Sequence, residues 1–569
     1  MPRKREMNTM RIRLVGLNAR FTHSCLALFC IRTELERYCP AAEVEIYQGT
    51  INDDYHHTLL RLIDGPPDAL LFSAAIWNNE PVRRLIGDCL RLLPGLAFVV
   101  GGPQAGEVGR MLPPGSITVV RGEIEAIGAD FYADLLAGRL RSHYAGSFLR
   151  LPHKELHFPY RAEDFQLHLQ HRHIYYESSR GCPFACSYCL SAAEKGVWHK
   201  GLNQVFAELE EILRHRPQVV RFVDRTFNDN PARALAIWRF LAAQGGDTLF
   251  HFEIAPDRFS EEMFAFLATV GTGRFQFEIG IQSTNDATLA AIDRRIDPGQ
   301  AHGLIRRLAA AANIHLHVDL ILGLPYETKE TYLHSFAAVF AMGAHYIQMG
   351  LLKVLPDTPI QRHAEAMGYL HCSEPPYSVL ANRWLGRDDM AALYWFGECV
   401  ERFHNNRYFV SLWRYLRAGG EEIAGFFLDL LALCHRQSFF QLAATQELMC
   451  RLLCLHLAGR DDEGLARDLL RYDWLRCGHR FLPPCLGLEE EREQPEATRD
   501  RLYRTMPMAV AGVYDLGDRN HFFRKAFCLR LSAAAARALG LGGADDGADL
   551  CFTARREESL FRFNEVMLL

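Results

Sequence analysis

The chain has 569 residues, 49% of them hydrophobic and 23% charged, and a formal net charge of −5. This length predicts about three domains, the composition is globular rather than disordered, and the charge gives no reason to expect nucleic-acid binding through a global basic field. Residues 1–11 are basic but lead into a strand-like run without the apolar core of a signal peptide. The most apolar helical stretch, 423–434, is too short to span a bilayer. We therefore expect a cytoplasmic protein without a membrane partner.

Residues 1–140 are predicted to form a Rossmann-like α/β domain. Near-continuous apolar runs alternate with helical patterns, which indicates a parallel sheet buried on both faces. The expected strands are 12–17, 44–47, 69–72, 97–100 and 117–120, and the expected helices are 25–38, 55–63 and 81–93.

The carboxyl ends of these strands are the expected binding edge, because ligands of parallel sheets bind there. Small residues at three of the four ends allow a bulky planar ligand to approach the backbone closely. The GxGxxG fingerprint is missing after the first strand, which argues against a nicotinamide or flavin. The residues at this edge are Asn18, Ser73 through Trp77, Gly101, Gly102, Pro103, Arg121, Gly122 and Glu123.

Residues 141–172 lack a sustained period and are predicted to be an extended linker. Residues 173–368 again alternate strand and helix signals, which predicts a partial (β/α)6 barrel with its chemistry at the carboxyl ends of the strands. The expected strands are 173–178, 219–223, 250–254, 274–279, 315–321 and 346–351, with helical runs such as 205–215, 232–243 and 329–341.

Three cysteines, Cys182, Cys186 and Cys189, follow the first of these strands in a CxxxCxxC array. Cysteine is the usual ligand of a [4Fe–4S] cluster, and three of them leave one iron open to bind a substrate. Sixteen cysteines in a chain without secretory features also favour metal ligation over disulfides. A zinc site, with His199 or His173 as a fourth ligand, and buried structural thiols are the alternatives.

Alternation along three barrel strands places polar side chains on one face, and the apolar sets must face the helices. Buried carboxylates need partners, so a polar or cationic ligand in the barrel is the economical explanation. Asp224, after the second strand, is either a pocket residue or a helix cap. The polar sets are His251 and Glu253, then Gln276, Glu278, Gly280 and Gln282, then His315, His317 and Asp319.

Residues 369–569 are predicted to form a mainly α-helical C-terminal domain, with strand-like runs at 526–531 and 550–553. Four of its cysteines, Cys450, Cys454, Cys477 and Cys485, are either a second metal centre or small buried hydrophobes.

The cysteine loop, with Tyr188 directly before the third cysteine, resembles the signature of the radical S-adenosylmethionine (SAM) superfamily. The resemblance implies that Cys182, Cys186 and Cys189 hold the cluster and that the open iron chelates SAM. An electron from the reduced cluster then releases a 5′-deoxyadenosyl radical. An electron donor such as flavodoxin or ferredoxin is the expected partner.

Three barrel segments, 250–257, 277–283 and 317–325, resemble the third to fifth strands of radical SAM proteins of the oxygen-independent coproporphyrinogen oxidase and cobalamin-dependent types. The resemblance implies that Glu253, Gln282, Arg294 and Asp319 contact SAM, with Arg294 on its carboxylate. Lys353 also resembles the cobalamin-dependent group, although Asp357 stands where glycine is more usual.

The segments 99–107 and 119–126 resemble a cobalamin-binding domain found upstream of such barrels, which implies that the binding edge listed above contacts cobalamin. The DxHxxG motif that supplies a cobalt ligand is absent, and His23 lies in the corresponding loop at another spacing. A C-terminal domain of unassigned role accompanies a subset of these enzymes.

The resemblance as a whole predicts a cobalamin-dependent radical SAM enzyme, most simply a methyltransferase acting on an unactivated carbon. A non-methylating radical cyclisation, ring contraction or rearrangement is one alternative. A non-catalytic cluster and corrinoid protein is another, disfavoured by the SAM-contacting residues. The substrate, a small molecule or a peptide, is not readable from the residues.

Overall fold

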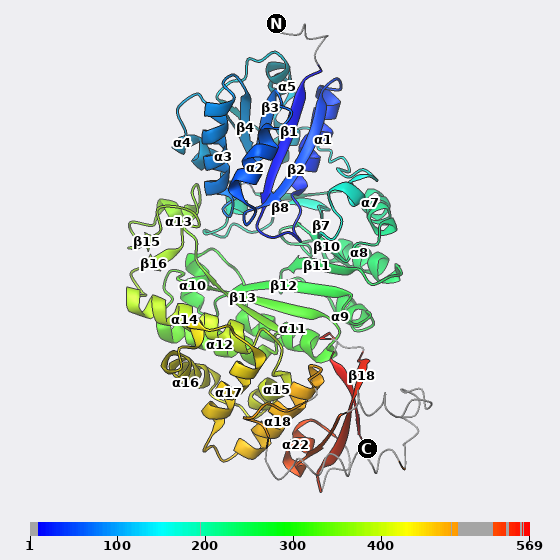
Figure 1. Cartoon of the computed structure of the whole chain (residues 1–569), viewed down its shortest axis with the longest axis vertical. Coiled ribbons are helices and arrows are strands. Elements are labelled where there is room, and N and C mark those ends of the chain that lie inside the picture. Colours follow the sequence, from blue (N-terminus) through cyan, green and yellow to red (C-terminus); the bar gives the residue numbers. More distant parts are fainter. Residues whose placement is uncertain are drawn as a thin grey trace. The chain divides into compact units, whose positions relative to one another are not determined.

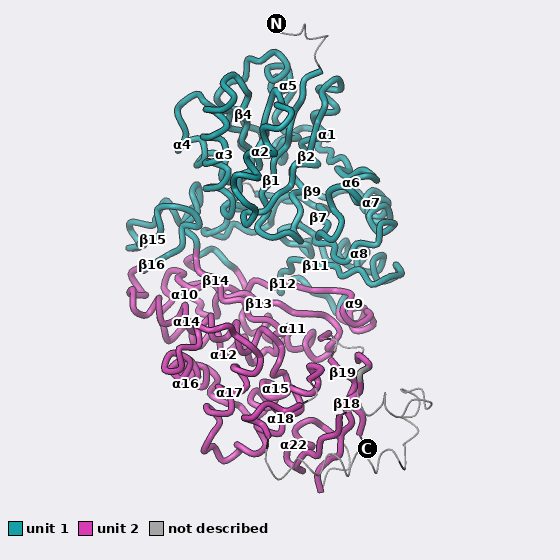
Figure 2. Tube along the Cα trace, in the orientation of Figure 1, with its two compact units in different colours: residues 1–263, 292–294, 353–380 teal, residues 264–291, 295–352, 381–569 magenta. Residues whose placement is uncertain are grey.

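The structure of the protein is a computed structural model that describes residues 9–193, 195–479, 481–487, 504, 527–541, 546–557, 560–561 and 563–568. The chain divides into two compact units, coloured teal and magenta in Figure 2. The first comprises residues 1–263, 292–294 and 353–380, and the second comprises residues 264–291, 295–352 and 381–569. Within the described ranges, every helix is too short or too polar to cross a lipid bilayer.

The first unit opens with a six-stranded parallel sheet in the order β2-β1-β3-β4-β5-β6 (Figure 1). The sequence pattern predicted this arrangement because strands such as LVGL and ALLF are apolar without alternation, and they are buried on both faces. The strands are β1 (Arg11–Asn18), β2 (Glu43–Thr50), β3 (Ala69–Ser73), β4 (Ala97–Gly101), β5 (Thr118–Arg121) and β6 (His143–Ala145).

Helices cover both faces of this sheet, which confirms the Rossmann-like prediction. Figure 1 shows α3 and α4 on one side and α1 on the other, and α1 packs against α5. Leu70, Phe72 and Val100 of the sheet pack with Val82 and Ile86 of α3 in one core. The helices are α1 (Leu26–Tyr38), α2 (Tyr55–Ile63), α3 (Asn79–Leu92), α4 (Ala105–Met111), η1 (Ile124–Ala126) and α5 (Ala129–Leu136).

The rest of the first unit contains three parallel strands in the order β7-β10-β11 and an antiparallel pair, β8 and β9. The segment expected as a linker holds β6, η2 (Phe148–Arg150) and α6 (Asp164–Leu167). The other elements are β7 (Ile174–Tyr176), β8 (Ser179–Cys182), η3 (Leu190–Ala193), β9 (Gly196–His199), α7 (Leu202–Arg214), β10 (Val219–Phe222), α8 (Pro231–Ala243), β11 (Leu249–Ile254), α13 (Pro359–Arg362), β15 (Leu370–His371) and β16 (Val379–Ala381).

The second unit contains the parallel strands β14-β13-β12 and their helices. Local signals set the helix ends: Asp297 caps the helix that begins with Pro298, and Gly343 ends the next one in the left-handed conformation. The elements are α9 (Glu261–Leu267), β12 (Phe275–Gln282), α10 (Asp286–Ala291), α11 (Pro298–Ala311), β13 (His315–Leu322), α12 (Lys329–Met342) and β14 (Tyr346–Leu351).

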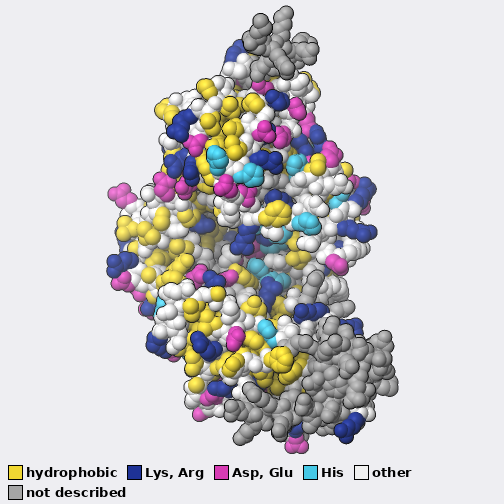
Figure 3. Space-filling model, in the orientation of Figure 1, with side chains coloured by type: hydrophobic (Ala, Val, Ile, Leu, Met, Phe, Trp, Pro, Cys, Tyr) yellow, Lys and Arg dark blue, Asp and Glu magenta, His cyan; other side chains and the backbone are white. Residues whose placement is uncertain are grey.

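The C-terminal part of this unit is mainly helical, as predicted, and ends in a three-stranded antiparallel sheet. Its elements are α14 (Arg387–Phe403), α15 (Val410–Ala418), α16 (Ile423–Arg436), η4 (Phe439–Gln441), α17 (Gln446–Leu457), α18 (Glu463–Arg476), β17 (Phe527–Leu531), α22 (Ala533–Ala538), β18 (Ala548–Arg556) and β19 (Asn564–Leu568). In Figure 3, acidic and basic side chains are interspersed over the described part of the face in view, in keeping with the small net charge.

Candidate cluster loop and cofactor pocket

The loop that carries the three cysteines begins at the end of β8 and is held from two sides. The Ser187 amide donates a hydrogen bond to the Ile292 carbonyl (3.0 Å), and the Ser187 carbonyl accepts one from the Ile360 amide (2.9 Å). Within the loop, the Cys189 amide donates to the Cys186 carbonyl (3.0 Å). These bonds fix the backbone between the second and third cysteines, as a preformed ligand loop requires.

The sulfur atoms lie beside groups that favour a thiolate. Arg294 Nη1 is 3.8 Å from Cys186 Sγ, and the Tyr188 hydroxyl also hydrogen-bonds to that sulfur. Burial raises the pKa of the Cys186 thiol, while Arg294 opposes the shift. Cys182 Sγ is 3.6 Å from Thr226 Oγ1. Hydrogen bonds of this kind to cluster sulfurs tune the potential of an iron–sulfur centre.

Two arginines flank the Phe184 ring of the loop. The guanidinium carbons of Arg294 and Arg258 each lie 5.2 Å from the ring centroid. The family resemblance indicated Arg294, but Arg258 was missed because no motif marks it. Arg258 also donates to the Asp229 carbonyl (2.8 Å). The loop therefore has a cationic border that suits an anionic cluster or a carboxylate.

Asp224 is buried at the end of β10, where it organises the start of the cluster strand. Its carboxylate accepts hydrogen bonds from the Ser178 amide (3.0 Å), the Ser178 hydroxyl (2.7 Å) and the Ser179 hydroxyl (2.5 Å). Burial raises the pKa of Asp224, and the serine hydrogen bonds offset part of that shift. Asp224 thus positions β8, a role that neither the pocket nor the helix-cap interpretation foresaw.

The imidazoles near the cluster loop contact protein side chains. His199 Nε2 pairs with the Asp229 carboxylate at 3.0 Å. His23 Nδ1 is 2.6 Å from the Tyr175 hydroxyl, and its ring packs against His173. Burial and Arg221 lower the pKa of His173 to about 4, and burial also lowers that of His23. Both rings are therefore neutral at pH 7.

A pocket of about 600 Å³ opens where the first sheet meets β8, within the first unit. Six of the residues expected at the sheet edge line it: Ser73, Gly101, Gly102, Pro103, Gly122 and Glu123. Asn18, residues 74–77 and Arg121 lie outside the lining. The Asn18 amide hydrogen-bonds to Gln48 (3.3 Å), Trp77 is half-exposed with its Nε1 on the Leu17 carbonyl (3.1 Å), and Arg121 is exposed.

Glycine stands at the positions of this sheet edge for different structural reasons. A Cβ at Gly102 would lie 2.5 Å from the Ala74 carbonyl oxygen, and Gly122 has φ of 86° and faces the Gly146 carbonyl even more closely. These two glycines are required by the fold itself. Gly101, in contrast, has open space where a Cβ would be. It is the glycine that leaves room for a ligand.

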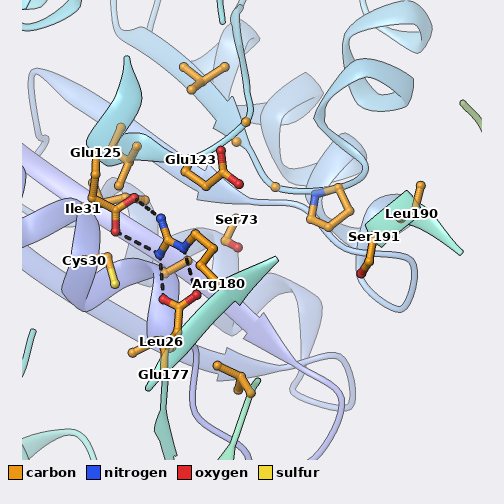
Figure 4. Close-up of a pocket in the computed structure, with 18 of the residues that line it drawn as sticks. Leu26, Cys30, Ile31, Ser73, Glu123, Glu125, Glu177, Arg180, Leu190 and Ser191 are labelled. Atoms are coloured by element: carbon orange, nitrogen blue, oxygen red, sulfur yellow. Dashed lines mark hydrogen bonds and ion pairs between the residues drawn. The ribbon is translucent and has the colours of Figure 1, made fainter. Parts of the chain in front are cut away.

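An ion-pair network on the pocket wall joins the sheet domain to β8, as Figure 4 shows. Arg180 Nη1 and Nη2 lie 3.0 and 3.2 Å from the Glu125 carboxylate oxygens, and Nε and Nη2 lie 2.8 and 2.6 Å from those of Glu177. Burial alone would lower the pKa of Arg180, but the two carboxylates outweigh it and raise the pKa. The sequence gave no signal for this network, since its partners are up to 55 residues apart.

The second unit carries the polar face that strand alternation predicted. Gln276, Glu278 and Gly280 of β12 lie opposite His315, His317 and Asp319 of β13, and the alternate residues are buried. Gln276 Nε2 lies 2.9 Å from His317 Nε2.

Gln282 ends β12 in an unusual conformation. It has φ of 71°, and the register shifts between Gly280 and Gln282. Among the described residues, its buried Oε1 has no hydrogen-bond partner. A strained residue with an orphaned buried oxygen is typical of a ligand site.

Glu253 is half-buried on β11 in the first unit, and its carbonyl accepts from the Phe227 amide (2.9 Å).

Asp357 has φ of 67°, the left-handed conformation that favours glycine, so the turn after Lys353 is kept despite the departure from the usual glycine. Glu253 and Arg294 thus belong to the first unit, while Gln282 and Asp319 belong to the second.

Two segments of the chain match known protein families. Residues 176–338 match the radical SAM superfamily, and residues 365–515 match a family described as a protein of unknown function (DUF4080). The chain is 24% identical over 418 residues to 2-(S-pantetheinyl)-carbapenam-3-carboxylate methyltransferase of Streptantibioticus cattleyicolor, covering 62% of this chain and 59% of the relative. It is 27% identical over 198 residues to the cobalamin-dependent radical SAM methyltransferase TokK of Streptomyces tokunonensis, covering 32% of this chain and 28% of TokK.

The chain therefore spans about three fifths of the first relative and just over a quarter of the second. Among solved structures, the cobalamin-dependent SAM radical enzyme OxsB with aqua-cobalamin bound superposes with a TM-score of 0.55 at 13% identity, over 82% of this chain and 80% of OxsB. Residues 176–338 are thus a radical SAM domain, in a chain that has the fold of a cobalamin-dependent radical SAM enzyme.

Proposed function

We propose that this protein is a cobalamin-dependent radical SAM enzyme that methylates an unactivated carbon of its substrate. One observation carries the proposal: the cluster loop and the pocket share β8. Arg180 and Gly181 of this strand line the pocket, and the next residue, Cys182, is the first cysteine of the loop. Residues that line the pocket therefore directly precede, in the chain, the first cysteine of the cluster loop.

The residues present fit the three cofactors. Cys182, Cys186 and Cys189 hold a [4Fe–4S] cluster, whose reduced form with bound SAM supplies a 5′-deoxyadenosyl radical. Glu253 and Arg294 of the first unit hold SAM beside the cluster loop, and the orphaned Oε1 of Gln282 supports a polar ligand at Gln282 and Asp319 within the second unit. A reduced flavodoxin or ferredoxin supplies the electron.

We infer that the pocket holds part of cobalamin, which when bound supplies a methyl carrier. The volume of about 600 Å³ is smaller than the whole cofactor, and the walls are mostly apolar, with charged groups confined to a few positions. Gly101 leaves open space at the sheet edge. The names of the relatives, both methyltransferases, support methyl transfer as the reaction.

The direct test is to incubate the reduced, cobalamin-loaded protein with methyl-labelled SAM. Formation of both S-adenosylhomocysteine and 5′-deoxyadenosine is expected. 5′-Deoxyadenosine alone would favour a non-methylating radical step, and neither product would favour a non-catalytic role. Gly101→Phe, which fills the pocket, should lose cobalamin but still form the cluster when reconstituted with excess iron and sulfide, and Gly101→Ala serves as its matched control.

We also propose that no protein imidazole binds the cobalt. No histidine is present among the described residues that line the pocket, and His23 is engaged by Tyr175. Electron paramagnetic resonance of the cob(II)alamin form should give the same spectrum for the wild type and for His23→Ala. A nitrogen triplet that vanishes in His23→Ala would contradict this assignment.

A further inference from the structure

Three thiols of the second unit converge although they come from two separate segments. Cys450 and Cys454 are one turn apart on α17, and Cys485 lies in the segment 481–487 that follows α18. Their sulfur atoms all lie within 4.8 Å of one another. Cys450 and Cys454 are buried, and Cys485 is half-buried. Cys477, the fourth cysteine that the sequence suggested, is directed instead to the Tyr408 carbonyl at 4.0 Å.

This separation suits one metal ion rather than a cluster. Tetrahedral Zn²⁺ with Zn–S bonds of about 2.3 Å holds its sulfurs about 3.8 Å apart, so the thiols need only a small adjustment. A cubane cluster would instead place each cysteine on a different iron.

The segment that carries Cys485 is held in place by α18. Arg467 Nη1 donates to the Cys485 carbonyl (3.2 Å), Arg471 Nε donates to the Leu486 carbonyl (2.8 Å), and Trp474 Nε1 donates to the Phe481 carbonyl (2.8 Å). Two prolines, Pro483 and Pro484, directly precede the cysteine and restrict the backbone. The third thiol is therefore brought to α17 by a built segment, which reduces the ordering cost of binding.

Other buried thiols of this unit form pairs and not triads. Cys399 of α14 lies against Cys434 of α16, and Cys528 faces Cys551 on neighbouring strands. Among the described residues, the triad of α17 and Cys485 is the one group of three metal-binding side chains within this distance. The ordinary interpretation of a buried cysteine as a small hydrophobe accounts for the pairs.

We propose that Cys450, Cys454 and Cys485 bind a single thiophilic metal ion, Zn²⁺, as three thiolates with a fourth position on the half-exposed side of Cys485. The ion joins α17 to the segment after α18 and is separate from the radical SAM site. Binding converts thiols to thiolates, so it releases protons to the solvent. The role is structural, since no pocket residue or cluster-loop residue belongs to the triad.

The test uses the full chain with Cys182, Cys186 and Cys189 replaced by alanine, which removes the thiols of the cluster loop. Titration with Co²⁺ should give thiolate-to-cobalt charge-transfer bands and tetrahedral d–d bands that saturate at one ion per chain, and Zn²⁺ should displace them. Adding Cys450→Ser, Cys454→Ser and Cys485→Ser should abolish the bands. Cys477→Ser and Cys399→Ser are the matched controls that should retain them.

A second measurement protects the test from misfolded variants. In the chain with its natural cysteines, alkylation by iodoacetamide followed by mass spectrometry should show Cys485 protected by added Zn²⁺. Equal labelling with and without Zn²⁺ would overturn the proposal, as would cobalt bands that persist in the triad variant. A disulfide between two of the three cysteines in the protein as purified would overturn the proposal too.

Discussion

The molecule contains two groups of three cysteines that are built in opposite ways. The cluster loop draws its cysteines from eight consecutive residues, and its sulfurs lie beside Arg294, Tyr188 and Thr226. The triad of Cys450, Cys454 and Cys485 joins a helix to a distant segment, and its sulfurs face one another. The difference teaches that cysteine count does not define a metal centre. Separation of the sulfurs and the groups around them decide whether a cluster or a single ion fits.

The largest effect is expected when the two groups of cysteines are mutated separately and the variants are compared. Cys186→Ala should abolish both the [4Fe–4S] absorbance and SAM cleavage, because a cluster with two remaining thiolates on this loop is not held. Replacing Cys450, Cys454 and Cys485 by serine should leave both properties in place. Iron content, visible absorbance and 5′-deoxyadenosine by mass spectrometry are the measurements. Loss of SAM cleavage in the triad variant at wild-type iron content would erase the distinction between the two groups.

Asp224 tests whether the cluster loop depends on its buried anchor. Asp224→Ala removes three hydrogen bonds and leaves Ser178 and Ser179 unpaired, which should cost about 2–4 kcal/mol of stability. Reconstituted iron content should fall with it. Asp224→Asn retains acceptor capacity and should lose less. Urea unfolding followed by circular dichroism gives the difference, and equal stability of the alanine variant and wild type would exclude the anchoring role.

Much of this contrast was predictable from sequence, but only where the information is local. The three cluster cysteines and most strand positions follow from spacing and apolar patterns within short windows. The position of Gly101 at the end of β4 follows from the apolar run before it, yet the requirement for Gly102 and Gly122 comes from close backbone neighbours that no pattern displays. Arg180 with Glu125, and Cys485 with Cys450, depend on contacts between distant segments, which a single sequence does not encode in any period.

Arg294 sharpens the comparison by testing the cation beside the cluster loop. Under the proposed function, Arg294→Ala removes a charge-assisted partner of the SAM carboxylate, which should cost about 1.5–3 kcal/mol, or one to two decades of affinity. Arg294→Lys should recover part of it, since lysine retains the charge without the planar fork. Equilibrium binding of SAM to cluster-loaded protein is the measurement. Unchanged affinity at wild-type cluster content would remove Arg294 from the SAM site.

The smallest expected effect concerns pH and the helical region that holds the triad. His404, buried at the end of α14, has its pKa lowered to about 4, mainly by burial. The unfolded chain therefore binds more protons than the folded one below pH 6.5, and stability falls as the pH drops from 6.5 towards 4. Between pH 7 and 5 this loss should be about 1–2 kcal/mol. His404→Asn, which retains a donor for Asn405, should reduce the loss; an identical pH profile for the variant would show that His404 does not titrate as stated.

The position of Arg180 links the pocket and the cluster loop through one strand. This residue forms part of the pocket wall and stands two positions before Cys182, so an ordered β8 serves both sites. When binding at one site orders β8, binding at the other site no longer bears that ordering cost. Each ligand then raises the affinity for the other by the same factor. Under the proposed function, protein loaded with the corrinoid should therefore take up the cluster at lower iron concentrations than protein without it.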